Sequence, residues 1–208
     1  MYAMSALKSG TAVDEASGAA PARPMRADAR RNYERLVSAA AVAFAERGER
    51  ASMDEIAKRA GVGAGTLYRH FPAREDLVAA VYRGGLEESC AKGRALLAEC
   101  EPGDALYAWL EVMALHWRAI GELRALMSAV FAERDDLKES CHDLVFGTAD
   151  ELIDDAKAAR AVRGDVTAPE VLRLVHAAVV ACEPKPGTVE IALDRMLELI
   201  TDGLRPRE

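Results

Sequence analysis

The chain has 208 residues, of which 50% are apolar, and a formal net charge of −7 at pH 7. This apolar content is sufficient for a buried core, and the length favours one large or two small domains. No apolar run approaches the ~18 residues that a membrane-spanning helix needs, which excludes that class. The four cysteines form no CxxC pair, so we expect reduced thiols and a cytoplasmic protein without membrane association.

Charge is distributed unevenly along the chain. Residues 21–83 hold 12 Lys/Arg and 8 Asp/Glu, a balance of +4, whereas residues 84–208 hold 14 and 24, a balance of −10. A basic head on an acidic body indicates two tasks in one chain, although a solvated charged face explains the same numbers.

The first 24 residues are rich in Ala, Gly, Ser and Pro and lack the pattern of a secretory signal. We expect residues 1–24 to be a disordered tail. The basic residues Arg23, Arg26, Arg30 and Arg31 follow. They fit an arm along DNA phosphates and a merely solubilising end equally well.

Apolar residues recur at helical spacing along nearly the whole chain, and no stretch alternates as a strand does. We therefore expect an all-α fold with nine helices. Two capping boxes mark helix starts, at Ser52 with Glu55 and at Thr167 with Glu170. The expected helices span approximately residues 26–47, 52–60, 64–70, 72–99, 104–120, 122–132, 137–163, 167–182 and 189–203.

The second and third helices are short and separated by only a few residues, as in a helix-turn-helix unit. Such a unit needs a small residue where its helices meet, which Ala57 provides, and a turn residue that tolerates positive φ, which Gly61 provides. It also needs apolar anchors. Those at suitable spacing are Ile56, Val62, Leu67 and Phe71.

The remaining residues of the third helix would then face outward. Small residues at its start would let the helix approach DNA closely, and the hydroxyl, aromatic and basic groups behind them suit base edges and phosphates. A phosphate-binding loop is excluded, because no Gly-Lys-Ser/Thr follows and no strand precedes. The alternative is a glycine-capped surface helix in an unrelated all-α protein.

The stretch ASMDEIAKRAGVGAGTLYRHFPAREDLVAAVY resembles the DNA-binding domain of tetracycline-repressor-like (TetR/AcrR) transcriptional regulators, with a match over about Ala29 to Tyr82. The body, ending in ALDRMLELITDGLRP, is similar in layout to the regulatory domain of that family. The resemblance implies a DNA-binding domain over residues 25–71 and a regulatory domain over residues 72–208. It also implies a homodimer and a cavity for a small-molecule effector, whose binding releases the repressor from double-stranded DNA.

The resemblance assigns DNA contacts residue by residue. Ser52 matches a hydroxyl that bonds a phosphate, and Thr66 and Tyr68 match groove and backbone contacts. His70 matches a phosphate contact, and Arg74 matches the usual Lys at the start of the fourth helix, from which we expect contacts to DNA of any sequence. Gly63 and Ala64 depart from the family pattern, where polar readers are common. More of the specificity would then depend on Arg69, Thr66, Tyr68 and DNA shape. The expected DNA-binding residues are Ser52, Gly63, Ala64, Gly65, Thr66, Tyr68, Arg69, His70 and Arg74.

The body holds both tryptophans and several Met and His residues in the region that the resemblance marks as a ligand cavity. Such a stripe is more often plain core, but Trp and His have polar tips that can orient a ligand. The expected ligand-binding residues are Trp109, Met113, His116, Trp117, Met127, Phe131, His142, Phe146 and His176.

No cofactor or metal is expected, because His116, Cys141, His142 and His176 show no short ligand spacing. No nucleophile motif such as G-x-S-x-G is present, so we expect no enzyme.

The last two helices carry more apolar surface than a monomer can cover, which predicts a two-fold four-helix interface and hence a palindromic operator. The expected interface residues are Val171, Val175, Val179, Leu193, Met196, Leu197, Ile200 and Leu204. The alternative function is a helical small-molecule-binding or interaction protein with a vestigial DNA-binding head.

Overall fold

The computed structural model describes residues 22–183 and 191–206. Within these ranges the chain forms nine α-helices, two short 3-10 helices and no strand, which confirms the all-α prediction. No helix in the described ranges is long and apolar enough to cross a membrane. The elements are α1 (Ala22–Arg47), η1 (Gly48–Arg50), α2 (Met53–Arg59), α3 (Ala64–His70), α4 (Arg74–Glu99), α5 (Pro102–Ala119), η2 (Gly121–Leu123), α6 (Arg124–Glu133), α7 (Asp135–Ala158), α8 (Ala168–Ala181) and α9 (Leu193–Leu204).

Most predicted boundaries agree with the structure to within a few residues, and α3 agrees at both ends. Helix α1 begins at Ala22, so residues 22–24 are helical rather than part of a tail, and the rest of the predicted tail lies outside the described residues. Helix α7 ends at Ala158, five residues before the predicted end, because Arg160 has a positive φ of 56° that breaks the helix. The predicted start of the last helix, at Val189, lies outside the described residues.

The two predicted capping boxes have different outcomes. At the start of α8 the backbone N–H of Thr167 donates to the Glu170 carboxylate at 2.9 Å, as predicted. At the start of α2 the Ser52 side chain forms no cap hydrogen bond, and Glu55 instead pairs with Arg47 at 2.6 Å. The prediction for Ser52 was therefore wrong, because a guanidinium from α1 competes for the carboxylate.

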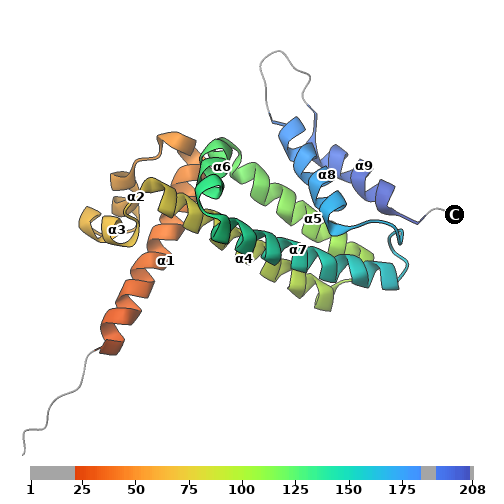
Figure 1. The fold of residues 1–208 in the computed structure, drawn as a ribbon, viewed down its shortest axis with the longest axis horizontal. Coiled ribbons are helices and arrows are strands. Elements are labelled where there is room, and N and C mark those ends of the chain that lie inside the picture. Colours follow the sequence, from red (N-terminus) through yellow and green to blue (C-terminus); the bar gives the residue numbers. More distant parts are fainter. Residues whose placement is uncertain (1–21, 184–190, 207–208) are drawn as a thin grey trace, which may run out of the picture.

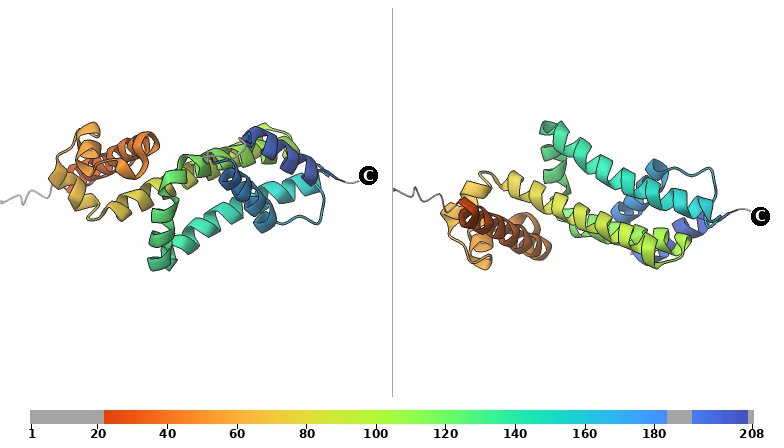
Figure 2. Two further views of the ribbon diagram at one scale, coloured as in Figure 1. Left: turned by 90° about the horizontal axis from the view of Figure 1, so that it is seen from above. Right: turned by 90° about the horizontal axis from the view of Figure 1, so that it is seen from below.

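Helices α1, α2 and α3 form a head at one end of the molecule, and α8 and α9 lie at the other end (Figure 1). Helix α4 connects them: it packs on α1 near the head and on α5, α7 and α6 in the body. Both views of Figure 2 show α4 passing out of the head into the body without interruption. The body core is one continuous cluster with the head core, so a change in the packing of α4 reaches both.

The head also touches the body through a second contact, between η1 and η2. Arg74, the first residue of α4, holds η1 in place: its guanidinium donates to the carbonyl oxygens of Ala51 at 2.5 Å, Glu49 at 2.8 Å and Gly48 at 3.3 Å. The same group lies 5.1 Å from the centre of the Phe44 ring. Since η2 leads directly into α6, this contact connects the head to a body helix other than α4.

Candidate DNA-binding helix and body cavity

The turn between α2 and α3 depends on Gly61, whose φ of +64° is a conformation that L-amino acids with side chains avoid. Its N–H donates to the carbonyl of Lys58 at 3.0 Å, and its own carbonyl accepts from the Arg35 guanidinium at 3.2 Å. Ala57 is buried beside this turn, where a larger side chain would separate the two helices. The turn thus fixes the direction in which α3 leaves α2.

The inner face of α3 is anchored by Leu67 and Phe71, both buried against the head core with Ile56. Figure 1 shows α3 at the outer end of the head. Its other face is open: Gly63, Ala64, Gly65, Tyr68 and Arg69 are exposed, and Thr66 and His70 are half-buried. A basic and aromatic helix face is therefore presented outward, as insertion into a DNA groove requires.

Two glycines leave the start of this face without side chains. A methyl group built on Gly63 or Gly65 would meet no other atom of the described chain within 4 Å. Neither glycine is therefore required by the packing of the protein itself. Their lack of side chains leaves room for a partner to approach the start of α3 closely.

The other two expected DNA contacts lie differently. Ser52 precedes α2, is exposed and forms no cap hydrogen bond, so its hydroxyl is available for a phosphate. Arg74 is turned inward on the carbonyls of η1. In this geometry it holds the head together and does not face the same direction as the exposed residues of α3.

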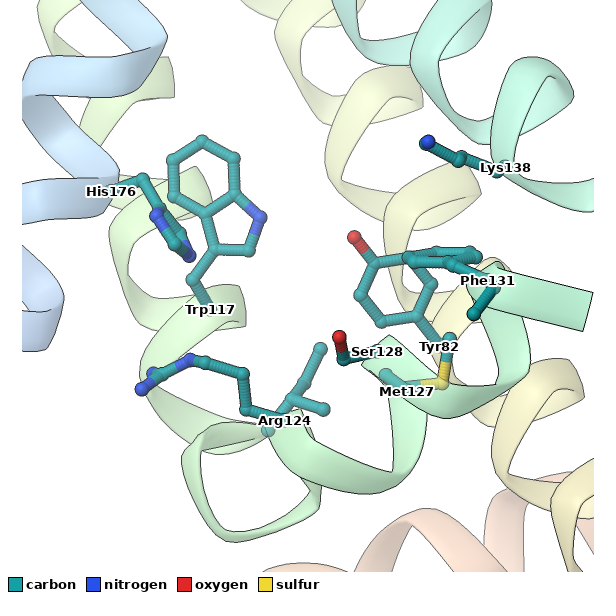
Figure 3. Close-up of a pocket in the computed structure, with 10 residues that line it drawn as sticks. Tyr82, Trp117, Arg124, Met127, Ser128, Phe131, Lys138 and His176 are labelled. Carbon is teal, nitrogen blue, oxygen red and sulfur yellow. The ribbon is translucent and has the colours of Figure 1, made fainter. Parts of the chain in front are cut away.

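The body contains a cavity of about 440 Å³ between α4, α5, α6, α7 and α8, in the size range of small-molecule sites. Figure 3 shows an open centre with the side chains arranged around it. Its lining residues are Tyr82, Trp117, Ile120, Arg124, Met127, Ser128, Phe131, Ala132, Lys138 and His176.

Two edge-to-face aromatic pairs stand on opposite sides of this cavity (Figure 3). Trp117 and His176 have ring centres 5.3 Å apart, and Tyr82 and Phe131 have ring centres 5.4 Å apart. Burial raises the pKa of the Tyr82 phenol to about 12, although the facing Trp117 opposes the shift. Burial also lowers the pKa of His176, and the positive charge of Arg124 lowers it further.

A second cavity of about 260 Å³ adjoins the first, with Tyr82, Trp117 and His176 in the walls of both. Its other lining residues come from α7 and α8 and include Cys141, where burial raises the pKa of the thiol.

The structure brings six of the nine expected ligand-binding residues to these cavities. Trp117, Met127, Phe131 and His176 line the larger cavity, and His142 and Phe146 line the smaller one together with His176 and Trp117. The lining residues that sequence reasoning missed are Tyr82, Ile120, Arg124, Ser128, Ala132 and Lys138 in the larger cavity and Cys141, Val145, Leu172 and Arg173 in the smaller one.

The other three expected ligand-binding residues lie elsewhere. Trp109 and Met113 are fully buried in the core, where the Trp109 indole N–H donates to the Ser89 carbonyl at 3.1 Å. His116 lines a cleft between α1, α4 and α5, where burial lowers its pKa to about 4. The Trp109 ring lies against Gly93, so a glycine on α4 admits this large side chain to the core and away from the cavities.

Most of the expected interface residues are already covered within one protomer. Val171, Val175 and Val179 have exposed fractions of 1%, 0% and 1%, because this stripe of α8 packs on α5 and α7. Leu193, Leu197 and Leu204 of α9 are buried as well. Of the expected set, only Met196 and Ile200 retain exposed surface.

A different stripe on α8 and α9 faces outward. Leu174 and Leu199 are 53% and 51% exposed. They line a groove of about 810 Å³ together with Ala177, Met196 and Ile200. Val171, Val175 and Val179 face the core of the protomer, so a partner cannot contact them as predicted. The stripe of α8 that remains exposed for a partner is the one that carries Leu174.

No group of three or more His, Cys, Asp or Glu residues in the described ranges is placed to hold a metal ion. Of the four residues that the sequence offered as a poor metal set, His116 lines the cleft, whereas Cys141, His142 and His176 all line the smaller cavity.

Comparison with known proteins matches both parts of the chain. Residues 36–81 match the family described as bacterial regulatory proteins, tetR family. Residues 101–206 match the family described as transcriptional regulator SbtR-like, C-terminal domain. An HTH-type transcriptional regulator of Staphylococcus aureus (strain USA300) is 50% identical over 54 residues, which are 26% of this chain and 29% of that relative. The match to these curated relatives thus spans less than a third of their length.

Two solved structures match over nearly their whole length. The TetR transcriptional regulator SCO0520 from Streptomyces coelicolor is 32% identical with a TM-score of 0.69, over 85% of this chain and 99% of that one. A TetR transcription regulatory protein from Mycobacterium vanbaalenii is 33% identical with a TM-score of 0.68, over 88% of this chain and 100% of that one. Together with the outward face of α3, these matches set aside the alternative of a vestigial head. The chain belongs to the TetR family and is a DNA-binding transcriptional regulator.

Proposed function

We propose that this protein is a cytoplasmic, non-enzymatic homodimeric repressor that leaves a palindromic operator when a small molecule occupies the cavity between α4 and α8. The observation that carries the proposal is the position of this cavity. Tyr82 forms part of its wall and belongs to α4, the helix that continues directly from the α2–α3 unit. A ligand that changes the packing of α4 therefore acts on the helix that carries the DNA-binding head.

A second connection supports the same proposal. Helix α6 contributes Arg124, Met127 and Phe131 to the cavity wall and is preceded by η2, which touches η1 of the head. A ligand that displaces α6 would act on the head through this contact in addition to α4. The ligand need only prefer the released state: a preference of about 100-fold corresponds to about 2.7 kcal/mol, within the usual allosteric range.

The outward groove of α8 and α9 supports the homodimer. It presents Leu174, Met196, Leu199 and Ile200 on a face that no described part of the chain covers. Two copies related by a two-fold axis would bury this face as a four-helix interface. Two recognition helices would then meet two half-sites of a palindrome.

The dimer is tested by sedimentation of the Leu199→Glu variant, which places a charge at a symmetric contact twice over. We expect a folded monomer. The control is Leu115→Glu, at an equally exposed leucine of α5 that lies outside the groove; this variant should remain a dimer. A dimeric Leu199→Glu protein would contradict the proposed interface.

Operator binding is tested by gel shift and footprinting on the DNA upstream of the coding region of this protein. The expected result is a protected palindrome whose binding weakens steeply with salt, because most contacts are to phosphates. Reciprocity requires that saturating operator weaken effector binding by the same factor as effector weakens operator binding. Equal effector affinity with and without operator would contradict release by effector while leaving DNA binding intact.

A further inference from the structure

The polar groups around the larger cavity are nearly all hydrogen-bond donors. The phenol of Tyr82, the indole N–H of Trp117, the hydroxyl of Ser128 and the ammonium of Lys138 surround its open centre (Figure 3). Of the ten described lining residues, none is a carboxylate or a carboxamide. The Trp117 N–H already faces the Tyr82 phenol oxygen, and Tyr and Ser can also accept. Lys donates only, so the Lys138 ammonium is the group that requires an acceptor from a ligand.

The positive charges at this cavity are unequally compensated. The Arg124 guanidinium donates to the Glu183 carboxylate at 2.5 Å, which offsets its charge. The Lys138 ammonium forms no ion pair with any carboxylate in the described ranges. Its side chain comes from the first turns of α7 and ends above the phenol of Tyr82 (Figure 3). An uncompensated cation beside an apolar wall favours an anionic ligand group.

The apolar walls describe the rest of the ligand. The Trp117–His176 pair faces the Tyr82–Phe131 pair across the open centre, and Met127 lies next to the Tyr82–Phe131 pair (Figure 3). Aromatic side chains pair favourably with other rings in edge-to-face and offset geometries. A flat aromatic body in the open centre could lie against rings of both pairs, within a cavity of about 440 Å³.

We propose that the effector is an organic anion with a flat aromatic body, whose acidic group binds Lys138 and whose rings lie in the open centre of the larger cavity against the two aromatic pairs. The inference rests on the proposed function, since it names the chemical class of ligand for the same cavity. It predicts weaker binding of organic cations, because the described lining offers a cation no carboxylate and places it beside Lys138.

The test compares three probes with the same ring system and different charge: naphthoate, its methyl ester and naphthylmethylammonium. Binding to the full-length protein is measured by titration calorimetry, without DNA. Naphthoate should bind at least about tenfold more tightly than the ester, because only its carboxylate can form a charge-assisted hydrogen bond with Lys138. The cation should bind more weakly than the ester. A preference for the ester or the cation, equal affinities, or no binding of naphthoate would each overturn the proposal.

Variants assign the preference to a residue. Lys138→Gln should reduce the naphthoate-to-ester preference to about twofold or less, and Lys138→Arg should retain it. The control is Lys92→Gln, which removes the same charge from an exposed lysine of α4 that lines neither cavity; it should leave all three affinities unchanged. A full preference in Lys138→Gln would refute the role of Lys138. Operator release by naphthoate is measured separately, so binding without release would contradict the proposed function and leave the ligand class standing.

Discussion

His116 gives the junction between head and body a dependence on pH that can be measured. Its ring lies in the cleft between α1, α4 and α5, 5.6 Å from the Tyr82 ring. Its Nε2 atom is buried and has no hydrogen-bond partner in the described structure. The ring also lies so close to Gly85 that a methyl group there would approach its Cε1 atom to 2.6 Å. The site therefore favours the neutral imidazole, because the protein gives the buried Nε2 atom no hydrogen-bond partner.

Burial lowers the pKa of His116 from 6.5 to about 4 in the folded protein. Since the folded pKa is the lower of the two, the unfolded chain takes up the proton first as the pH falls. The free energy of unfolding is therefore unaffected by His116 above about pH 6.5, and it falls progressively as the pH is lowered from there to about pH 4. These values give a loss of about 2 kcal/mol between pH 7 and pH 5, and about 3 kcal/mol by pH 4.

The assay is urea unfolding followed by circular dichroism at several pH values between 7 and 5, for the wild type and for His116→Phe. The phenyl ring keeps the contact with Tyr82 but cannot bind a proton. The free energy of unfolding of the variant, relative to that of the wild type, should rise by about 2 kcal/mol as the pH falls to 5. His142→Phe, at an exposed histidine of α7, is the control and should run parallel to the wild type. Parallel curves for His116→Phe would refute the burial argument.

Glycine-to-alanine substitutions can be compared in two pairs, one in the head (Gly61 and Gly65) and one in α4 (Gly93 and Gly84). Gly61→Ala should lower the free energy of unfolding by about 1–2 kcal/mol, because φ is +64° at that position. Gly65→Ala should leave the free energy of unfolding unchanged or raise it, and it should weaken operator binding by about tenfold. Retained operator affinity in Gly65→Ala would contradict close approach at that position. In α4, Gly93→Ala would bring a methyl group to 2.5 Å from an indole ring and should cost about 1–3 kcal/mol. A methyl group at Gly84 would make only ordinary van der Waals contacts, so Gly84→Ala should raise the free energy of unfolding, measured by thermal unfolding, by about 0.5–1 kcal/mol.

The sequence could predict those features that local chemistry determines. The α2–α3 turn follows from the positive φ of Gly61, and the exposed face of α3 follows from its anchors Leu67 and Phe71. The start of α8 follows from the pairing of Thr167 with Glu170. In each case the determining residues lie within a few positions of one another, so periodicity and capping rules apply.

The cavity could not be predicted in the same way, because its lining depends on how five helices cross. Tyr82 and Lys138 lie on helices whose cavity-facing side is set by packing, and neither belongs to a Met or aromatic run that would have singled it out. Trp109 resembles Trp117 in sequence context but enters the core because Gly93 of α4 leaves room for it. Similarly, α8 is apolar on several sides, and only its packing on α5 and α7 decides which stripe remains for a partner.

Arg74 provides the last prediction, because sequence resemblance and structure assign it different roles. A phosphate contact would make the affinity for DNA depend on its charge, and its removal would lower the slope of log affinity against log salt by about one. In the structure its guanidinium is occupied by the carbonyls of Gly48, Glu49 and Ala51.

We therefore expect Arg74→Gln to lower the free energy of unfolding by about 1.5–3 kcal/mol, the cost of losing hydrogen bonds from a charged donor. Its salt slope for operator binding, measured by fluorescence anisotropy, should equal that of the wild type. Arg69→Gln, on the exposed face of α3, should show the reverse: unchanged stability and a slope lower by about one. A reduced slope for Arg74→Gln would mean that the guanidinium leaves η1 for a phosphate when DNA binds. The contact between η1 and η2 would then change with operator binding, and the head would be coupled to the wall of the cavity through Arg74 itself.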